Sequence, residues 1–200
     1  MSNKICFIDI DGPLLPIRAY HLPGQTQLVT KFDPCAVSLV NKLIEDSGAK
    51  IVISSTWAQN GLEKCQELFI DNHIPAYHFH EDWMTPRKFT SARTSEIRWW
   101  LEDHPEITNY VAIDDEQLDS ELLPGFVQCD AYEGFSYRNY CEARLLLGVA
   151  SKEETELILY LKRKEIWRTH RIGEKNEHLT HIFADKVFPV TKKKNSLTHF

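Results

Sequence analysis

Two carboxylates stand two residues apart near the start of the chain, where an apolar run at residues 4–10 ends. They are Asp9 and Asp11, and Gly12 follows them. A carboxylate can attack the phosphorus of a phosphomonoester and form an aspartyl-phosphate, while a second protonates the leaving oxygen and then activates water. We therefore expect Asp9 to be the nucleophile and Asp11 the general acid and base. Gly12 permits a sharp turn that aims backbone amides at phosphate oxygens.

A second acidic pair, Asp114 and Asp115, directly follows another apolar run, Tyr110–Ile113. Carboxylates that face a phosphate dianion repel it, so the reaction requires a cation. Hard oxygen ligands beside a phosphate match Mg²⁺, which binds one or two carboxylates and several waters. We expect Asp114 and Asp115 to supply ligands; the alternative is an acidic turn that ends a strand.

Two further sites could bind the phosphate. Ser54 and Ser55 follow the apolar run at residues 50–53, and the Ser54 hydroxyl could donate to a phosphate oxygen. Arg93 or Lys88 could place a positive charge over the phosphate and over Asp9, which would stabilise the transition state. The alternative for Arg93 is a surface arginine at the start of a helix.

The elements that must position these residues alternate along the chain. Apolar runs bounded by turn residues predict strands, and segments with a 3.6-residue apolar period predict helices. Asp33-Pro34 opens one helix as cap and first residue, and Gly48 ends it. The predicted strands are 4–10, 50–54, 74–79, 110–113 and 126–129, and the predicted helices include 34–47, 61–72 and 137–147. This alternation predicts a three-layer α/β/α, Rossmann-like fold with a mostly parallel sheet, whose ligands bind beyond the carboxyl ends of the strands.

Charge divides the chain into a body, residues 1–150, and an extension, residues 151–200. The body has 12 basic and 22 acidic residues, a balance of −10, whereas the extension has 11 basic and 7 acidic residues, a balance of +4. A Ser-x-x-Glu capping box at Ser151–Glu154 predicts a helix that runs to about Arg168. Its basic residues could bind nucleic acid or an anionic membrane surface; the alternative is a solvated helix.

Several protein classes are excluded by composition. No stretch approaches the roughly 20 apolar residues of a membrane helix, so an integral membrane protein is not expected. The apolar run after Lys4 is too short for a signal peptide, and we predict a cytoplasmic protein. Five widely spaced cysteines contain no CxxC pair, which argues against a zinc site or a disulfide framework.

Taken in order, these motifs resemble the haloacid-dehalogenase-like (HAD) superfamily over about residues 4 to 135. The resemblance implies a nucleophile at Asp9, an acid/base at Asp11, a phosphate binder at Ser54 and a basic third motif at Arg93. It further implies that Mg²⁺ is held by Asp9, by the Asp11 carbonyl and by Asp115 with Asp114 beside it. Aspartate at position 11 is typical of the phosphatase branch.

The short gaps between motifs resemble the capless subgroup, which accepts phosphates on large substrates. Similar members are magnesium-dependent protein phosphatases and polynucleotide 3′-phosphatase or RNA-repair domains, and the turn Ser54–Trp57 resembles the latter. Those domains often carry an arginine after this turn, where this chain has Ala58 and Gln59. The leading expectation is therefore a phosphoprotein (phosphotyrosine) phosphatase. The alternatives are a nucleic-acid-end or nucleotide phosphatase and a HAD-like binding module without turnover.

Overall fold

Five parallel strands form the central sheet of the computed structural model, which describes residues 3–24, 30–86 and 91–171, the last seven as backbone only. The strands are β1 (Lys4–Ile8), β2 (Lys50–Ile53), β3 (Phe79–Met84), β4 (Asn109–Asp114) and β5 (Phe126–Gln128). Their order is β3-β2-β1-β4-β5, and each neighbouring pair is parallel. The predicted α/β fold is confirmed. All carboxyl ends meet at one edge, which brings the residues after β1, β2 and β4 together.

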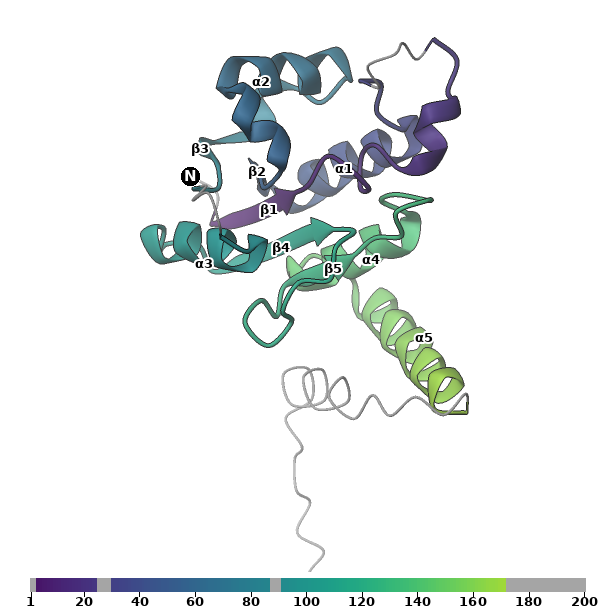
Figure 1. Cartoon of the computed structure of the whole chain (residues 1–200). Coiled ribbons are helices and arrows are strands. Elements are labelled where there is room, and N and C mark those ends of the chain that lie inside the picture. Colours follow the sequence, from purple (N-terminus) through teal and green to yellow (C-terminus); the bar gives the residue numbers. More distant parts are fainter. Residues whose placement is uncertain (1–2, 25–29, 87–90, 172–200) are drawn as a thin grey trace, which may run out of the picture. The chain divides into compact units, whose positions relative to one another are not determined.

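Both faces of the sheet are buried, and every residue of β1 and β2 after the first is apolar. Ile5 and Phe7 pack in the core on one face with α3 (Arg93–Asp103), where Trp100 lies edge-to-face with Phe7. Cys6 and Ile8 pack in the core on the other face. That core is covered by α1 (Pro34–Ser47), α2 (Leu62–Asp71) and α4 (Tyr137–Leu146). Figure 1 shows α3 on one side of the sheet and α1 and α4 on the other.

The first helix has the ends that the sequence predicts. Asp33 caps α1, because its side chain accepts hydrogen bonds from the backbone amides of Cys35 and Ala36, both at 3.0 Å. Gly48 ends the helix with a left-handed φ of +67°. The Asp33 carboxylate also binds the Arg18 guanidinium at 2.9 and 3.1 Å. Asp33 therefore anchors the 3₁₀ helix η1 (Ile17–His21) to the start of α1.

The sequence places the third strand wrongly. The predicted strand at 74–79 is instead a short 3₁₀ helix, η3 (Ala76–His78), and β3 begins only at Phe79. Pro75 fixes its own φ and the chain turns there, with the His78 amide donating to the Pro75 carbonyl at 3.0 Å. β3 lies at the sheet edge, so its middle residues are polar and exposed, unlike those of the central strands.

The segments that join the motifs to the helices are short. Between β1 and α1, the described residues contain one regular element, η1. Between β2 and α3 they form η2 (Thr56–Asn60), α2, η3 and β3, which joins the central sheet. Among the described residues neither connection builds a separate cap over the strand ends.

A long helix, α5 (Lys152–Arg171), follows the body, and its predicted capping box is confirmed. The Glu154 amide donates to Ser151 Oγ at 3.1 Å, and the Ser151 amide donates to Glu154 Oε2 at 2.7 Å. The chain divides into compact units at Glu156, within this helix. The assignment of residues 151–200 as a functional extension remains a prediction, as does its binding to anionic partners. Over the part of the chain that is described, no helix is long and apolar enough to cross a membrane.

Candidate phosphoryl-transfer site

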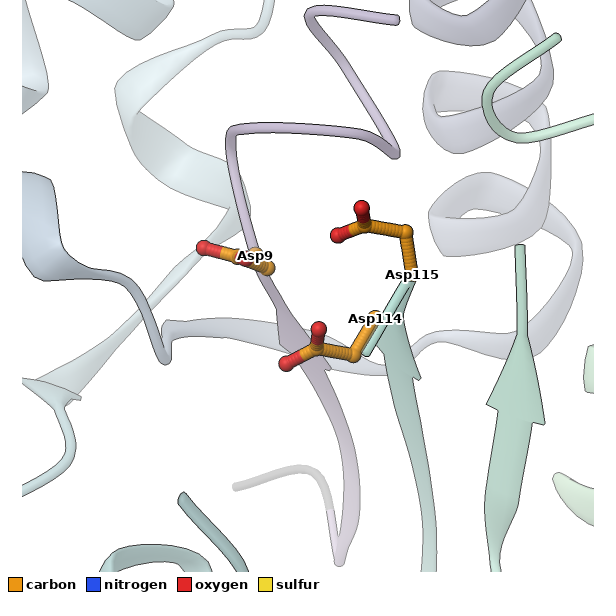
Figure 2. Close-up of side chains that lie close together, drawn as sticks. All are labelled: Asp9, Asp114 and Asp115. Carbon is orange, nitrogen blue, oxygen red and sulfur yellow. The ribbon is translucent and has the colours of Figure 1, made fainter. Parts of the chain in front are cut away.

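Three carboxyl groups converge beyond the ends of β1 and β4. Asp9 directly follows β1, where its amide extends the sheet by donating to the Ile113 carbonyl at 3.0 Å. Asp114 ends β4 and Asp115 follows it. One ligand oxygen from each of the three aspartates lies within 4.8 Å of the others. Figure 2 shows the three side chains grouped at these strand ends. In the sequence Asp9 is far from Asp114 and Asp115. The three come together because β1 and β4 are neighbouring parallel strands.

Burial makes this cluster costly to charge. Asp9 is 5% and Asp114 is 2% exposed. Burial is the largest influence on both groups and raises the pKa of Asp9 to about 6 and that of Asp114 to about 7. The charge of Asp9 further raises the pKa of Asp114. Burial also raises the pKa of Asp115, which is more open to solvent. A nearby positive charge would therefore strongly stabilise the ionised form of the cluster.

Arg93 supplies part of that charge from the first position of α3. Its Nη1 lies 3.4 Å from Asp9 Oδ1 and its Nε lies 3.7 Å from Asp114 Oδ2. The Arg93 side chain is only 10% exposed, so the pair is poorly screened by water. Its charge lowers the pKa of both aspartates against the effect of burial. Arg93 thus contacts Asp9 although the two residues are 84 positions apart in sequence.

The serines after β2 lie beside Asp9. The Ser54 amide donates to the Ile8 carbonyl at 2.9 Å, which places Ser54 next to the end of β1. Its hydroxyl is buried and has no hydrogen-bond partner among the described residues. A buried polar group normally has a partner, so this hydroxyl is suited to an incoming oxygen acceptor. A hydrogen bond with the Ser55 side chain lowers the pKa of Asp9, so Ser55 contacts the Asp9 carboxylate.

Asp11 differs from the other three aspartates because it is exposed. Its Oδ2 accepts a hydrogen bond of 2.8 Å from the indole Nε1 of Trp57. The contact joins the first motif to the turn after β2. Sequence reasoning missed this role of Trp57, although its place directly after Ser54 and Ser55 was a usable signal. The Asp11 carboxylate is outside the three-oxygen cluster, and metal ligation by its carbonyl remains a proposal.

Gly12 is required for the cluster to form. Its φ is +79°, a conformation that side chains disfavour. A Cβ added there would also lie 2.3 Å from Asp115 Cγ, far inside van der Waals contact. Asp115 can reach the cluster only because residue 12 has no side chain.

These residues fit a magnesium ion. The donor set consists of hard carboxylate oxygens from Asp9, Asp114 and Asp115, with Arg93 offsetting part of their charge. Such an ion would neutralise carboxylate charge and phosphate charge together. Of the predicted cations, Arg93 is in contact with the site, whereas Lys88 lies outside the described residues.

A parallel α/β sheet with paired aspartates, a serine and a buried arginine beyond its carboxyl ends defines a HAD-type protein. Residues 5–140 match the family described as the HAD domain in Swiss Army Knife RNA repair proteins. The chain belongs to this family, which supports a hydrolase of the general phosphatase type. A search of curated proteins and a search of solved structures each found no match.

Proposed function

We propose that this protein is a magnesium-dependent phosphatase that removes a terminal phosphate from RNA through an aspartyl-phosphate on Asp9. The observation that carries the proposal is the convergence of Asp9, Asp114 and Asp115 within 4.8 Å, with Arg93 3.4 Å from the nucleophile. The RNA-repair description of the family favours a nucleic-acid end over the phosphoprotein expected from sequence.

The reaction follows from the positions of these groups. Asp9 Oδ attacks phosphorus, and the bond between phosphorus and the leaving oxygen breaks. Asp11, held by Trp57, gives a proton to that oxygen. Water then attacks the aspartyl-phosphate, Asp11 takes one of its protons, and inorganic phosphate leaves with Asp9 restored.

The surrounding residues stabilise charge during both steps. Arg93 is suited to a phosphate oxygen because it lies against the carboxylate that would attack, and the Ser54 hydroxyl is suited to one because it is buried without a partner among the described residues. The pKa of about 6 at Asp9 leaves it ionised, and therefore nucleophilic, at neutral pH and above. Bound Mg²⁺ would supply further charge neutralisation and would be held by the aspartate cluster.

A substrate panel tests this proposal. RNA oligonucleotides with a 3′- or 5′-phosphate, their DNA counterparts, a phosphotyrosine peptide and p-nitrophenyl phosphate are compared with Mg²⁺ and with EDTA. We expect Mg²⁺-dependent phosphate release with the highest kcat/KM for an RNA end. Asp9→Asn should abolish release, whereas Asp103→Asn, an exposed position on α3, should leave it unchanged.

Other outcomes separate the alternatives. Preference for the peptide would replace RNA by phosphoprotein as the substrate. No release from any substrate, with no effect of Asp9→Asn, would leave a binding module without turnover.

A further inference from the structure

Two tyrosines are strongly exposed on segments near the site. Tyr20 lies in η1 and is 55% exposed, and Tyr132 lies in the turn after β5 and is 67% exposed. Both segments follow the carboxyl ends of strands, the edge at which the aspartates gather. Neither ring contributes to the core clusters, so both are open to contact with a partner.

The two segments are joined by backbone hydrogen bonds. The Ile17 amide donates to the Ala131 carbonyl at 2.9 Å, and the Arg18 amide donates to the Tyr132 carbonyl at 3.4 Å. Tyr20 is two residues from the second of these bonds, and Tyr132 takes part in it. The two backbone segments that carry the tyrosines therefore form one continuous surface.

That surface is fixed directly to the catalytic backbone. The Phe135 amide donates to the Pro13 carbonyl at 2.9 Å. A Cβ added to Gly134 would lie 2.9 Å from the same carbonyl, so the turn packs closely on the residue after Gly12. Gly12 in turn contacts Asp115. Since two residues span at most about 7 Å, the Tyr132 backbone lies within a short distance of the cluster.

Both supports of this surface are rigid. Arg18 is held by two hydrogen bonds to Asp33, the cap of α1, which fixes η1. The Asp130 side chain accepts hydrogen bonds from the amides of Tyr132 and Glu133, at 2.8 and 3.1 Å, which fixes the turn. Aromatic rings on fixed backbones lose little entropy when they bind a flat partner.

The charge of the body limits how else a nucleic acid could be held. Residues 1–150 carry 12 basic and 22 acidic residues, so the net charge of the body does not attract a polyanion. Stacking of bases on aromatic rings needs no charge and tolerates any sequence. It also suits single-stranded RNA, whose bases are free to leave the stack.

We propose that Tyr20 and Tyr132 form a stacking platform for the nucleobases next to the terminal phosphate of single-stranded RNA. This inference rests on the proposed function, because it concerns the substrate of the same site. The platform holds the last nucleotides while the phosphate enters the aspartate cluster.

The test compares a double variant with the wild type on two substrates. In Tyr20→Ala/Tyr132→Ala, we expect KM for a phosphorylated RNA oligonucleotide to rise about tenfold or more, given the usual contribution of a stacked base. Its kcat/KM for p-nitrophenyl phosphate, which has no base, should stay unchanged. Tyr20→Phe/Tyr132→Phe keeps both rings and should keep the wild-type KM.

Two controls isolate stacking. Tyr77→Ala removes a tyrosine that is 69% exposed on η3, before β3 and so toward the opposite edge of the sheet, and should have no effect. An oligonucleotide whose terminal nucleotides lack bases should give wild-type protein the raised KM of the alanine variant.

The possible failures are distinguishable. If wild-type protein releases phosphate from RNA but the alanine variant has the same KM, the platform is wrong and the proposed function stands. If the variant loses activity on both substrates equally, the tyrosines support the fold and the platform is again wrong. If wild-type protein releases no phosphate from any RNA, the proposed function fails and the platform fails with it.

Discussion

At the scale of single residues, the site combines groups that would be unfavourable separately. Asp9 and Asp114 are buried carboxylates, and Arg93 is a nearly buried cation that lies within 4 Å of both. Removing one partner of such a set leaves uncompensated buried charge, which costs more than the pair contributes. Loss of Arg93 should therefore change both the ionisation of the aspartates and the rate of turnover.

We predict that Arg93→Met lowers kcat by about 100-fold or more, the usual cost of losing one transition-state donor. The acidic limb of the pH profile should also move to higher pH. Arg93 lowers the pKa of Asp9. Without Arg93 this pKa rises, so Asp9 ionises only at higher pH. Arg98→Met, on the same helix but exposed, is the matched control. An unchanged pH profile would contradict the proposed role.

Trp57 is proposed to position Asp11 through its 2.8 Å hydrogen bond. We predict that Trp57→Phe lowers kcat/KM about tenfold for an alkyl phosphate, which corresponds to one orienting hydrogen bond. The loss should be smaller for p-nitrophenyl phosphate, whose leaving group departs without protonation. Equal losses on the two substrates would point to a general structural effect, and Trp99→Phe controls for the loss of a tryptophan elsewhere.

At the scale of elements, Asp33 joins two pieces of the fold. It caps α1 and binds Arg18 of η1, the helix that also carries Tyr20. Asp33 thus fixes the segment between β1 and α1 at the end next to α1.

We predict that Asp33→Ala lowers the free energy of unfolding by about 1 to 2 kcal/mol through loss of the cap. For a chain of this size that corresponds to a Tm lower by roughly 2 to 8 °C. Asp33→Asn retains a capping oxygen and should recover most of the loss in thermal denaturation. If both variants were equally destabilised, the ion pair with Arg18 rather than the cap would be the main contribution.

At the scale of the whole molecule, the aspartate cluster couples stability to pH and to metal. Asp9 and Asp114 have pKa values of about 6 and about 7, above the ordinary aspartate value of 3.8. The folded protein therefore binds more protons than the unfolded chain between about pH 4 and 7. Stability is lost as pH rises through this window.

We predict that, in EDTA, Asp114→Asn matches the wild-type Tm near pH 4 and exceeds it at pH 7.5. The asparagine cannot ionise, so it escapes the cost of a buried charge. A variant that is less stable than wild type at pH 7.5 would show that the carboxylate is already compensated without metal.

With Mg²⁺ bound, wild-type protein should have a higher Tm than Asp114→Asn. At 100 times its Kd, the ion should stabilise wild-type protein by about 2.7 kcal/mol, or roughly 5 to 10 °C in Tm. The effect should be smaller at pH 5, because the ligands must lose protons to bind. Asp115→Asn should weaken the response at both pH values, and an identical response would exclude Asp115 as a ligand.

Local sequence determined the elements and their order. Apolar runs at β1, β2 and β4 and the Asp33 and Gly48 caps of α1 depend on neighbouring residues, so they can be predicted from them. β3 could not, because an edge strand needs only one partner and its polar residues 80–82 carry no apolar signal. The mostly parallel sheet predicted from their alternation then placed Asp9, Asp114 and Asp115 at one edge.

Only the tertiary structure decided how these groups meet. The burial that raises the pKa of Asp9 and Asp114, and the reach of Arg93 to both, depend on packing between elements far apart in sequence. So do the bond from Trp57 to Asp11 and the joining of the Tyr20 and Tyr132 segments. The sequence by itself determined which chemical groups stand at the strand ends. Distances, shielding from water and charge balance arise only when the sheet closes, because each depends on several elements at once.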